Sequence, residues 1–250
     1  MAGHSKWKQI KHKKGVTDAR RGQLFTKLTR EVTISAREGG GDPAANFRLR
    51  LAIQKARDGN MPLDNIERAI KRGTGEGGEQ INYEQVSYEG YSAGGAAIYV
   101  QGLTDNRHRT VAEVRNVFSK LGGNMGESGS VGWLFEQKGV VSAEAPEDQV
   151  EELALAAIDV GADDVKTDGG SMEVFAPIEK LEAVREALQA ENAEILSAEL
   201  EMVAKTSTPI DASAAKQALR LMDGLEELDD IQKVYTNADF PEEVFAGMDE

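Results

Sequence analysis

Near the start of the chain, apolar residues recur every three or four positions, which is the spacing of one face of an α-helix. This pattern predicts three short helices, over about residues 17–38, 43–59 and 62–73. The pair Asp42-Pro43 is typical of a cap followed by proline at the first helical position, and Gly73 is expected to end the third helix. The expected buried stripes are Leu24, Phe25, Leu28 and Val32; Leu49, Ala52, Ile53 and Ala56; and Leu63, Ile66 and Ile70. Together they predict a small helical bundle.

The middle of the chain changes to the period-two alternation of β-strands. Strands are predicted over 82–91 and 94–103, with a hairpin turn at Ser92. Thr110 and Glu113 fit a capping box, so a helix is expected to start at Thr110, with a buried face of Val111, Val114, Phe118 and Leu121. A glycine-rich loop, 122–132, then leads into a strand predicted over 133–137.

Residues 139–204 alternate between the two periodicities in a regular series. The pattern predicts strands and helices in the order β-α-β-β-α-β, which is the ferredoxin-like, split βαβ arrangement. The predicted elements are a strand at 140–141, a helix at 146–160, strands at 164–167 and 172–176, a helix at 178–188 and a strand at 195–203. The inward positions of the first of these helices are expected to be Val150, Leu153, Ala157 and Ile158.

A last helix, from residue 211 to about 222, and a strand from residue 231 have no sheet of their own. They are expected to return to the strands predicted before residue 104. The sequence therefore predicts an α+β fold with a basic helical bundle, a discontinuous α/β domain and an inserted ferredoxin-like βαββαβ domain. Their expected ranges are 1–75, then 76–135 with 206–250, and 136–205.

Charge is distributed very unevenly along this pattern. The 250-residue chain has a net charge of −14, yet its first thirty residues hold nine Lys and Arg against one acid, Asp18. Up to Arg72 there are 17 basic and 7 acidic residues, which leaves 12 basic and 36 acidic for the remainder. Such a reversal of sign indicates a basic part that meets a polyanion, carried on an acidic body.

Composition excludes several other classes. Without cysteine there is no disulfide, thiolate metal site or cysteine nucleophile, and no apolar run is long enough to cross a membrane. The basic N-terminus lacks the apolar segment of a secretory signal, so a cytoplasmic location is expected. The three histidines lack the i, i+4 spacing of a helical zinc site. The carboxylate pairs, Asp229-Asp230 among them, are read as surface or turn residues. We therefore expect no catalytic residues, metal, cofactor or small-molecule substrate.

Glycine-rich stretches give no nucleotide site. Gly73, Gly75 and Gly78 fit G-x-G-x-x-G, but they follow a helix and precede a strand, the reverse of the dinucleotide-binding context. The loop 122–132 lacks the Gly-Lys-Ser/Thr ending of a P-loop, and Glu127 would repel phosphate.

Nucleic-acid binding has the better physical support, because Lys and Arg displace counterions from phosphates. Trp7 fits two interpretations equally, stacking on an exposed base or packing onto the helical bundle. A second basic group begins the helix after Asn106, where a helix N-terminus favours anions. Residues 1–16 are polar and basic and are interpreted as an arm. Basic residues are spread over this arm and the helical bundle, which favours contact with the nucleic-acid backbone or with RNA shape over base reading. The predicted contact residues are Lys6, Trp7, Lys8, Lys11, His12, Lys13, Lys14, Arg20, Arg21, Lys27, Arg30, Arg107, Arg109 and Arg115.

Eight segments of the chain form a specific set of motifs: Met1–Trp7, Asp18–Val32, Gly39–Pro43, Asn46–Ile53, Asn60–Gly73, Tyr88–Tyr91, Thr104–Arg115 and Gly122–Phe135. Together these motifs resemble the YebC family. The resemblance implies a basic helical N-terminal domain and two α/β domains around a cavity, the third inserted into the second. It also implies a cytoplasmic, non-enzymatic regulator associated with nucleic acid.

Family members differ in the target that the resemblance implies. Bacterial members are regarded as probable transcriptional regulators that bind DNA. Mitochondrial relatives look like translational activators, and some bacterial members are assigned to the ribosome, where they help it through proline runs. The expected partner is thus DNA, or ribosomal RNA on the ribosome. Two other hypotheses stay open: an enzyme with a site near Arg107 and Glu127, and an adaptor that binds proteins through its acidic domains.

Overall fold

The structure is a computed structural model that describes residues 18–76 and 83–245, with side chains from Arg21 onward. The described residues form two compact units. Unit 1 comprises the chain up to Leu134 together with the segment from Thr206, and unit 2 is Phe135–Lys205. Helices and antiparallel sheets occur in both units, so the predicted α+β class is confirmed. The division of unit 1 at residue 75 stays a prediction.

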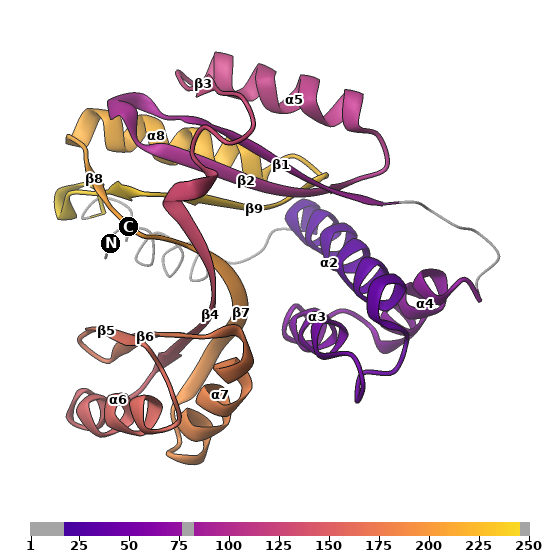
Figure 1. The fold of residues 1–250 in the computed structure, drawn as a ribbon, viewed down its shortest axis with the longest axis vertical. Coiled ribbons are helices and arrows are strands. Elements are labelled where there is room, and N and C mark those ends of the chain that lie inside the picture. The colour runs from indigo at the N-terminus through magenta and orange to yellow at the C-terminus, as the bar shows by residue number, and fades with distance from the viewer. Residues whose placement is uncertain (1–17, 77–82, 246–250) are drawn as a thin grey trace. The chain divides into compact units, whose positions relative to one another are not determined.

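Three helices begin unit 1: α2 (Asp18–Gly39), α3 (Phe47–Asp58) and α4 (Leu63–Thr74) (Figure 1). Their buried faces form one cluster, and Leu24, Phe25 and Ile70 pack at its edge, so most of the predicted stripes are confirmed. Leu63 is an exception, because its side chain is exposed. The cluster is made of Leu28, Val32, Ala36, Leu49, Ala52, Ile53, Ala56, Met61, Ile66 and Ala69.

The predicted start of the second helix is wrong. Asp42 accepts a bond from the backbone N–H of Ala44 and closes a turn, and α3 begins later, with Asn46 as its cap. The Oδ1 atom of Asn46 accepts from the N–H of Leu49 at 3.0 Å, while its buried Nδ2 donates to two backbone carbonyls of the preceding segment at 2.8 Å. Asn46 both caps α3 and bonds to the segment before it, so the helix starts after Asn46 and not at Pro43.

The predicted end of α4 is also displaced, since Gly75, with φ of 84°, provides the left-handed C-cap in place of Gly73. Gly73 lies inside the helix, where α4 crosses α2. A Cβ atom there would lie 2.4 Å from the carbonyl oxygen of Thr33 and 2.8 Å from the Cβ of Ala36. Glycine at this position therefore permits close helix packing.

The second part of unit 1 is a four-stranded sheet in the order β3-β1-β2-β9. Its strands are β1 (Glu84–Tyr91), β2 (Ala97–Thr104), β3 (Asn124–Met125) and β9 (Ile231–Thr236). Strand β9 pairs antiparallel with β2, so the predicted return of the C-terminal segment to this sheet is confirmed. A separate two-stranded sheet pairs β8 (Thr208–Pro209) parallel with β10 (Ala238–Asp239), and β10 follows β9 in the chain.

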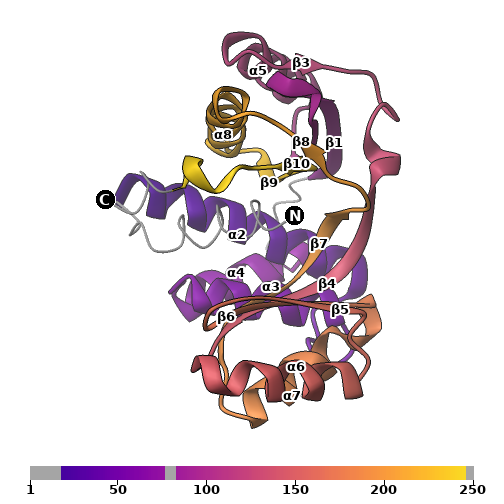
Figure 2. The same ribbon diagram turned by 90° about the vertical axis from the view of Figure 1, so that its left-hand side faces the viewer.

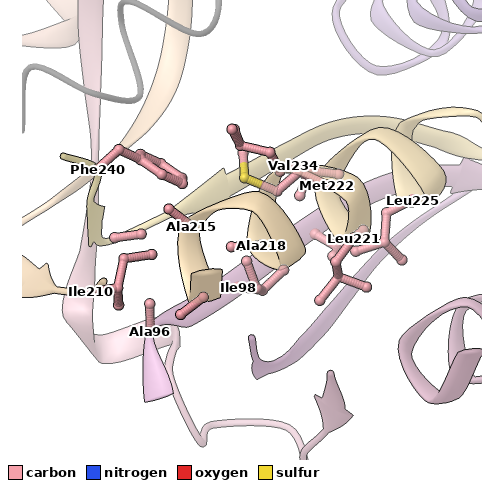
Figure 3. Close-up of a cluster of buried hydrophobic side chains, with 14 of the residues drawn as sticks. Ala96, Ile98, Ile210, Ala215, Ala218, Leu221, Met222, Leu225, Val234 and Phe240 are labelled. Carbon is pink, nitrogen blue, oxygen red and sulfur yellow. The ribbon is translucent and has the colours of Figure 1, made fainter. Parts of the chain in front are cut away.

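Helices α5 (Arg107–Lys120) and α8 (Ala212–Glu226) cover one face of this sheet (Figures 1 and 2). The apolar side of α8 packs against Ile98 of β2 and Val234 of β9, as Figure 3 shows. Helix α5 contributes Val114 and Phe118 to the same cluster. These contacts give the discontinuous segments a shared core.

The capping-box prediction for α5 is wrong. Asn106 is the cap, its Oδ1 atom accepting from the N–H of Arg109 at 3.1 Å, and the helix begins at Arg107. Thr110 is fully buried within the helix. Its hydroxyl group is thereby available for a partner distant in sequence, described below.

Unit 2 contains β4 (Phe135–Glu144), α6 (Val150–Asp159), β5 (Asp164–Asp168), β6 (Ser171–Ala176), α7 (Leu181–Ala190) and β7 (Glu194–Ala204). The strand order is β5-β6-β4-β7, with every pair antiparallel, and both helices lie on one face (Figure 2). This is the predicted ferredoxin-like arrangement.

Two details of unit 2 differ from the predictions. The strands predicted at 133–137 and 140–141 are one strand, β4, which starts only at Phe135. Ile158, predicted to point inward, is 50% exposed. Ala157 occupies the inward position of that turn, and the next residue lies about 100° further round the helix. None of the helices in the described ranges is long and apolar enough to cross a membrane.

Replacing Gly73 by alanine should lower the free energy of unfolding by about 1–3 kcal/mol, because a backbone oxygen of α2 cannot move out of the way. Gly22→Ala is the matched control, since no atom lies within 4 Å of a Cβ there. That variant should gain up to about 1 kcal/mol from helix propensity. Urea unfolding measures both, and unchanged stability of Gly73→Ala would contradict the close packing.

Candidate nucleic-acid interface

Half of the predicted contact residues lie outside the described residues. The side chain of Arg20 is likewise not described, although the residue belongs to α2. The residues outside are Lys6, Trp7, Lys8, Lys11, His12, Lys13 and Lys14. Their contacts with nucleic acid stay predictions.

The first half of α2 runs along the segment that joins α8 to β9. Arg21 is exposed, with its guanidinium group 5.9 Å from the centre of the Phe25 ring. The Nζ atom of Lys27 donates to the carbonyl oxygen of Glu226 at 2.5 Å, and Gln23 donates to the carboxylate of Asp229 at 3.3 Å. Part of this basic helix is therefore engaged with an acidic segment of the same unit.

Asp230 is the centre of the contact between α2, α5 and the sheet. Its carboxylate, 2% exposed, receives Arg30 Nη1 at 2.7 Å on one oxygen and Arg109 Nη2 at 2.6 Å on the other. The hydroxyl groups of Thr110 and Thr104 donate to that second oxygen at 2.6 and 3.0 Å. Four donors from three elements thus converge on one buried carboxylate. The sequence-based reading of Asp230 as a surface or turn residue is wrong.

Burial alone would raise the pKa of the Asp230 carboxyl group. The hydrogen bonds from Thr110, Arg109 and Thr104, together with the charge of Arg30, outweigh it and lower that pKa below its ordinary value. The same contacts raise the pKa of Arg109, which also pairs with Asp105 at 2.8 Å. The network is therefore fully charged at neutral pH. A buried carboxylate is tolerated because its partners replace the water it has lost.

Two further arginines lie beside this network. The Nη2 atom of Arg37 donates to the carbonyl oxygen of Tyr83 at 2.6 Å, and Arg107 Nε lies 3.1 Å from the carboxylate of Glu84. The guanidinium group of Arg30 also lies over the Tyr83 ring, 5.5 Å from its centre. We call Arg30, Arg37, Arg107 and Arg109 the arginine cluster. It draws two arginines from α2 and two from α5.

Members of the arginine cluster differ greatly in exposure. Arg30 is only 11% exposed, whereas the side chains of Arg107 and its partner Glu84 are 65% and 61% exposed. Ion pairs in water contribute little, because solvent and salt screen them, so Arg107 can exchange Glu84 for a phosphate at small cost. Arg37 and Arg115 are exposed as well. The exposed members thus have the chemistry of a phosphate-binding surface.

Sequence reasoning missed Arg37, Asp230 and the two threonines. Arg37 lies in the last turn of α2 and has no basic neighbour, so no charge run marks it. Thr104 and Thr110 lie 126 and 120 residues from Asp230 in the chain. The only local signal was the acidic pair directly before an apolar strand, which also fits an exposed turn.

The glycine-rich loop is held by a second buried acid, Glu89 of β1. Its carboxylate accepts from the backbone N–H groups of Gly129, Val131 and Gly132 at 2.8, 2.6 and 2.6 Å. Burial raises the pKa of Glu89, but these three bonds outweigh it and leave the pKa lowered. These N–H groups are therefore occupied by an internal carboxylate. Among the residues that the structure describes, no three acidic or histidine side chains are grouped to hold a metal ion.

The fold and the interface define an α+β protein with a basic helical part and a ferredoxin-like unit. Residues 5–76 match the TACO1/YebC protein N-terminal domain, and residues 83–238 match the TACO1/YebC second and third domain. The chain belongs to the TACO1/YebC family.

Relatives agree over almost the whole length. A probable transcriptional regulatory protein of Dehalococcoides mccartyi (strain BAV1) is 53% identical over 244 residues, covering 98% of this chain and 97% of the relative. One of the same name from Rubrobacter xylanophilus is 53% identical over 246 residues, with 98% of each covered. The crystal structure of a conserved hypothetical protein from Aquifex aeolicus has a TM-score of 0.81 at 43% identity, covering 91% of this chain and 93% of that one. The names of the curated relatives support a regulator of the YebC type.

The Glu89 contacts predict an acid-sensitive loop. A carboxyl group whose pKa is lowered by folding stabilises the folded state above its unfolded value, about 4.3 for Glu, and loses that contribution as pH falls through the lowered folded value. Glu89→Gln should therefore lower stability at neutral pH and flatten its decline below about pH 5. It should also speed amide hydrogen exchange at Gly129, Val131 and Gly132, measured by NMR.

Glu127→Gln is the control for this prediction, because it neutralises an exposed carboxylate of the same loop. It should leave the acid-dependent loss and the exchange rates as in the unaltered chain. Slow exchange at the three glycine-loop amides in Glu89→Gln would show that Glu89 does not hold the loop.

Proposed function

We propose that this protein is a non-enzymatic regulator of gene expression that binds nucleic acid. The observation that supports it most directly is the separation of charge: 17 of the 29 Lys and Arg precede residue 73, against 7 of the 43 acidic residues. A basic surface of this kind is the electrostatic footprint of a protein that contacts phosphates. Exposed Arg107 and Arg115 extend that footprint onto α5.

The contacts proposed are with the phosphate backbone. They use the basic residues of the first thirty positions, apart from the nearly buried Arg30, together with the exposed arginines of α5. In the part of the chain that the structure describes, no single helix concentrates the basic residues as a recognition helix would, which favours sequence-independent binding. The names of the curated relatives favour DNA as the nucleic acid.

Ribosomal RNA is the alternative, and a specific observation favours it. Beyond Arg72 the chain holds 36 acidic residues against 12 basic ones, so most of the protein repels a long polyanion. Such a protein suits a binding site in which only its basic N-terminal part contacts nucleic acid. A translation factor that contacts ribosomal RNA or tRNA, and relieves stalling at difficult sequences such as proline runs, meets this requirement.

Co-sedimentation with ribosomes, beside a shift assay with duplex DNA, distinguishes the two targets. Both are measured from about 50 to 200 mM salt, a range over which roughly six to ten phosphate contacts cost about 10³–10⁵ in affinity. Ribosome binding that outlasts DNA binding would identify a translation factor. Sequence-specific DNA binding that persists at the higher salt, without ribosome association, would identify a transcriptional regulator. Binding to neither would refute the proposal.

Reversing the charge of Lys11, Lys13 and Lys14 to Glu should abolish tight binding without unfolding the chain. Loss of three phosphate contacts should reduce the slope of log K against log salt by about 2 to 3. The control variant makes the same change at exposed lysines of the acidic part, namely Lys180, Lys205 and Lys216. It should keep the original slope. Equal effects of the two variants would mean that only total charge matters.

A further inference from the structure

The arginine cluster depends on a junction between segments distant in the chain. Arg30 and Arg37 belong to α2, whereas Arg107 and Arg109 belong to α5. Asp230 bonds to one member from each helix, Arg30 and Arg109. It therefore links the basic helical part of unit 1 to the basic end of α5.

Removing the Asp230 carboxylate would take away the acid that bridges Arg30 and Arg109. The loss would affect Arg30 most, because its side chain is only 11% exposed and water screens its positive charge least. The other acids of the cluster pair with arginines of α5: Asp105 with the Nη2 atom of Arg109, which also bonds Asp230, and Glu84 with Arg107. The threonine hydroxyl groups hold Asp230 toward α5 and the sheet, so the carboxylate is fixed on that side.

The exposed arginines of the two helices meet over adjacent residues. Arg37 donates to the carbonyl oxygen of Tyr83, and Arg107 pairs with the carboxylate of Glu84. Both arginines are exposed, and the ion pair of Arg107 with Glu84 is itself exposed to solvent. Glu38, the residue after Arg37, is already paired with Arg48, and Asp105 is paired with Arg109. Arg37 and Arg107 are thus placed to bind neighbouring phosphates.

We propose that Asp230 is a positioning residue for nucleic-acid binding, which joins Arg37 of α2 and Arg107 of α5 into one phosphate-binding surface. Asp230 itself touches no nucleic acid. It acts through Arg30 and Arg109, whose guanidinium groups it holds together. This inference rests on the proposed function and adds to it a second set of phosphate contacts, which includes Arg37, a residue that no charge run reveals.

The test is a double-mutant cycle on the full-length chain. Arg37→Gln with Arg107→Gln removes the proposed surface, and Asp230→Asn removes the residue that positions it. Asp229→Asn is the matched control, an exposed neighbour whose change in charge is the same. Binding of a short duplex DNA and of a ribosomal RNA fragment is measured as a function of salt for each variant.

In the unaltered chain and in Asp229→Asn, loss of the two arginines should reduce the salt slope by about 1.5, as expected for two phosphate contacts. Asp230→Asn alone should reduce the slope by a similar amount. In the Asp230→Asn background, removing the arginines should then have no further effect. Such non-additivity is the mark of a residue that acts through the others.

Arg30→Gln covers the case in which Asp230→Asn fails to fold, because it breaks the link to α2 and leaves the contacts of Asp230 with α5 in place. It should show the same non-additivity with Arg37 and Arg107. Additive effects in both backgrounds, or an unchanged salt slope in a folded Asp230→Asn variant that merely melts earlier, would reduce Asp230 to a structural residue. Failure of the unaltered chain to bind either probe would overturn the proposed function, and this inference with it.

Discussion

The buried carboxylate of Asp230 is the interaction on which the arrangement of unit 1 depends. A carboxylate with 2% exposure has lost its hydration and is stable only with charged and hydrogen-bonding partners at close range. It finds them in Arg30, Arg109 and two threonine hydroxyl groups, all at 2.6 to 3.0 Å. Leaving any of these charges unpaired costs about 3–5 kcal/mol in typical proteins. The helical part, α5 and the C-terminal strand are therefore constrained to meet at this one point.

This constraint bears on function because it determines which basic residues are available. Arg30 is nearly buried, and its positive charge is paired with Asp230. Arg107 is exposed, and its partner Glu84 can be exchanged for another anion. A count of basic residues in the sequence treats the two alike. The structure separates cations that build the junction from cations that face solvent. Only the second kind releases counterions from a polyanion at little cost.

Sequence patterns predicted the elements well wherever a local period determined them. The stripe of α2 and the βαββαβ order of unit 2 follow from spacing within one segment. The same reasoning failed where a residue's partner lies far away in the chain. Thr110 satisfies a capping-box pattern but serves Asp230, 120 residues distant. The pairing of β9 with β2 was inferred only by elimination, because a lone strand must find a sheet. Charge alone predicted the α5 arginines of the candidate site, but no sequence signal predicted Asp230, the acid that organises it.

The two buried acids Glu89 and Asp230 have opposite effects on where unit 1 offers positive groups to an anion. Glu89 occupies the N–H groups of Gly129, Val131 and Gly132, which in a phosphate-binding loop would face the ligand. The glycine-rich loop therefore supplies its own anion and offers no cradle to another. Asp230 instead pairs with two of the four arginines of the cluster, Arg30 and Arg109. Glu84 pairs with Arg107, and Asp105 pairs with Arg109 as well. Glu89 thus fills a potential anion site in the glycine-rich loop, whereas Asp230 leaves Arg37 and Arg107 of the arginine cluster without a bond to it. Under the proposed function, a phosphate therefore binds at the arginines of α2 and α5, whereas the glycine-rich loop is better suited to holding the fold.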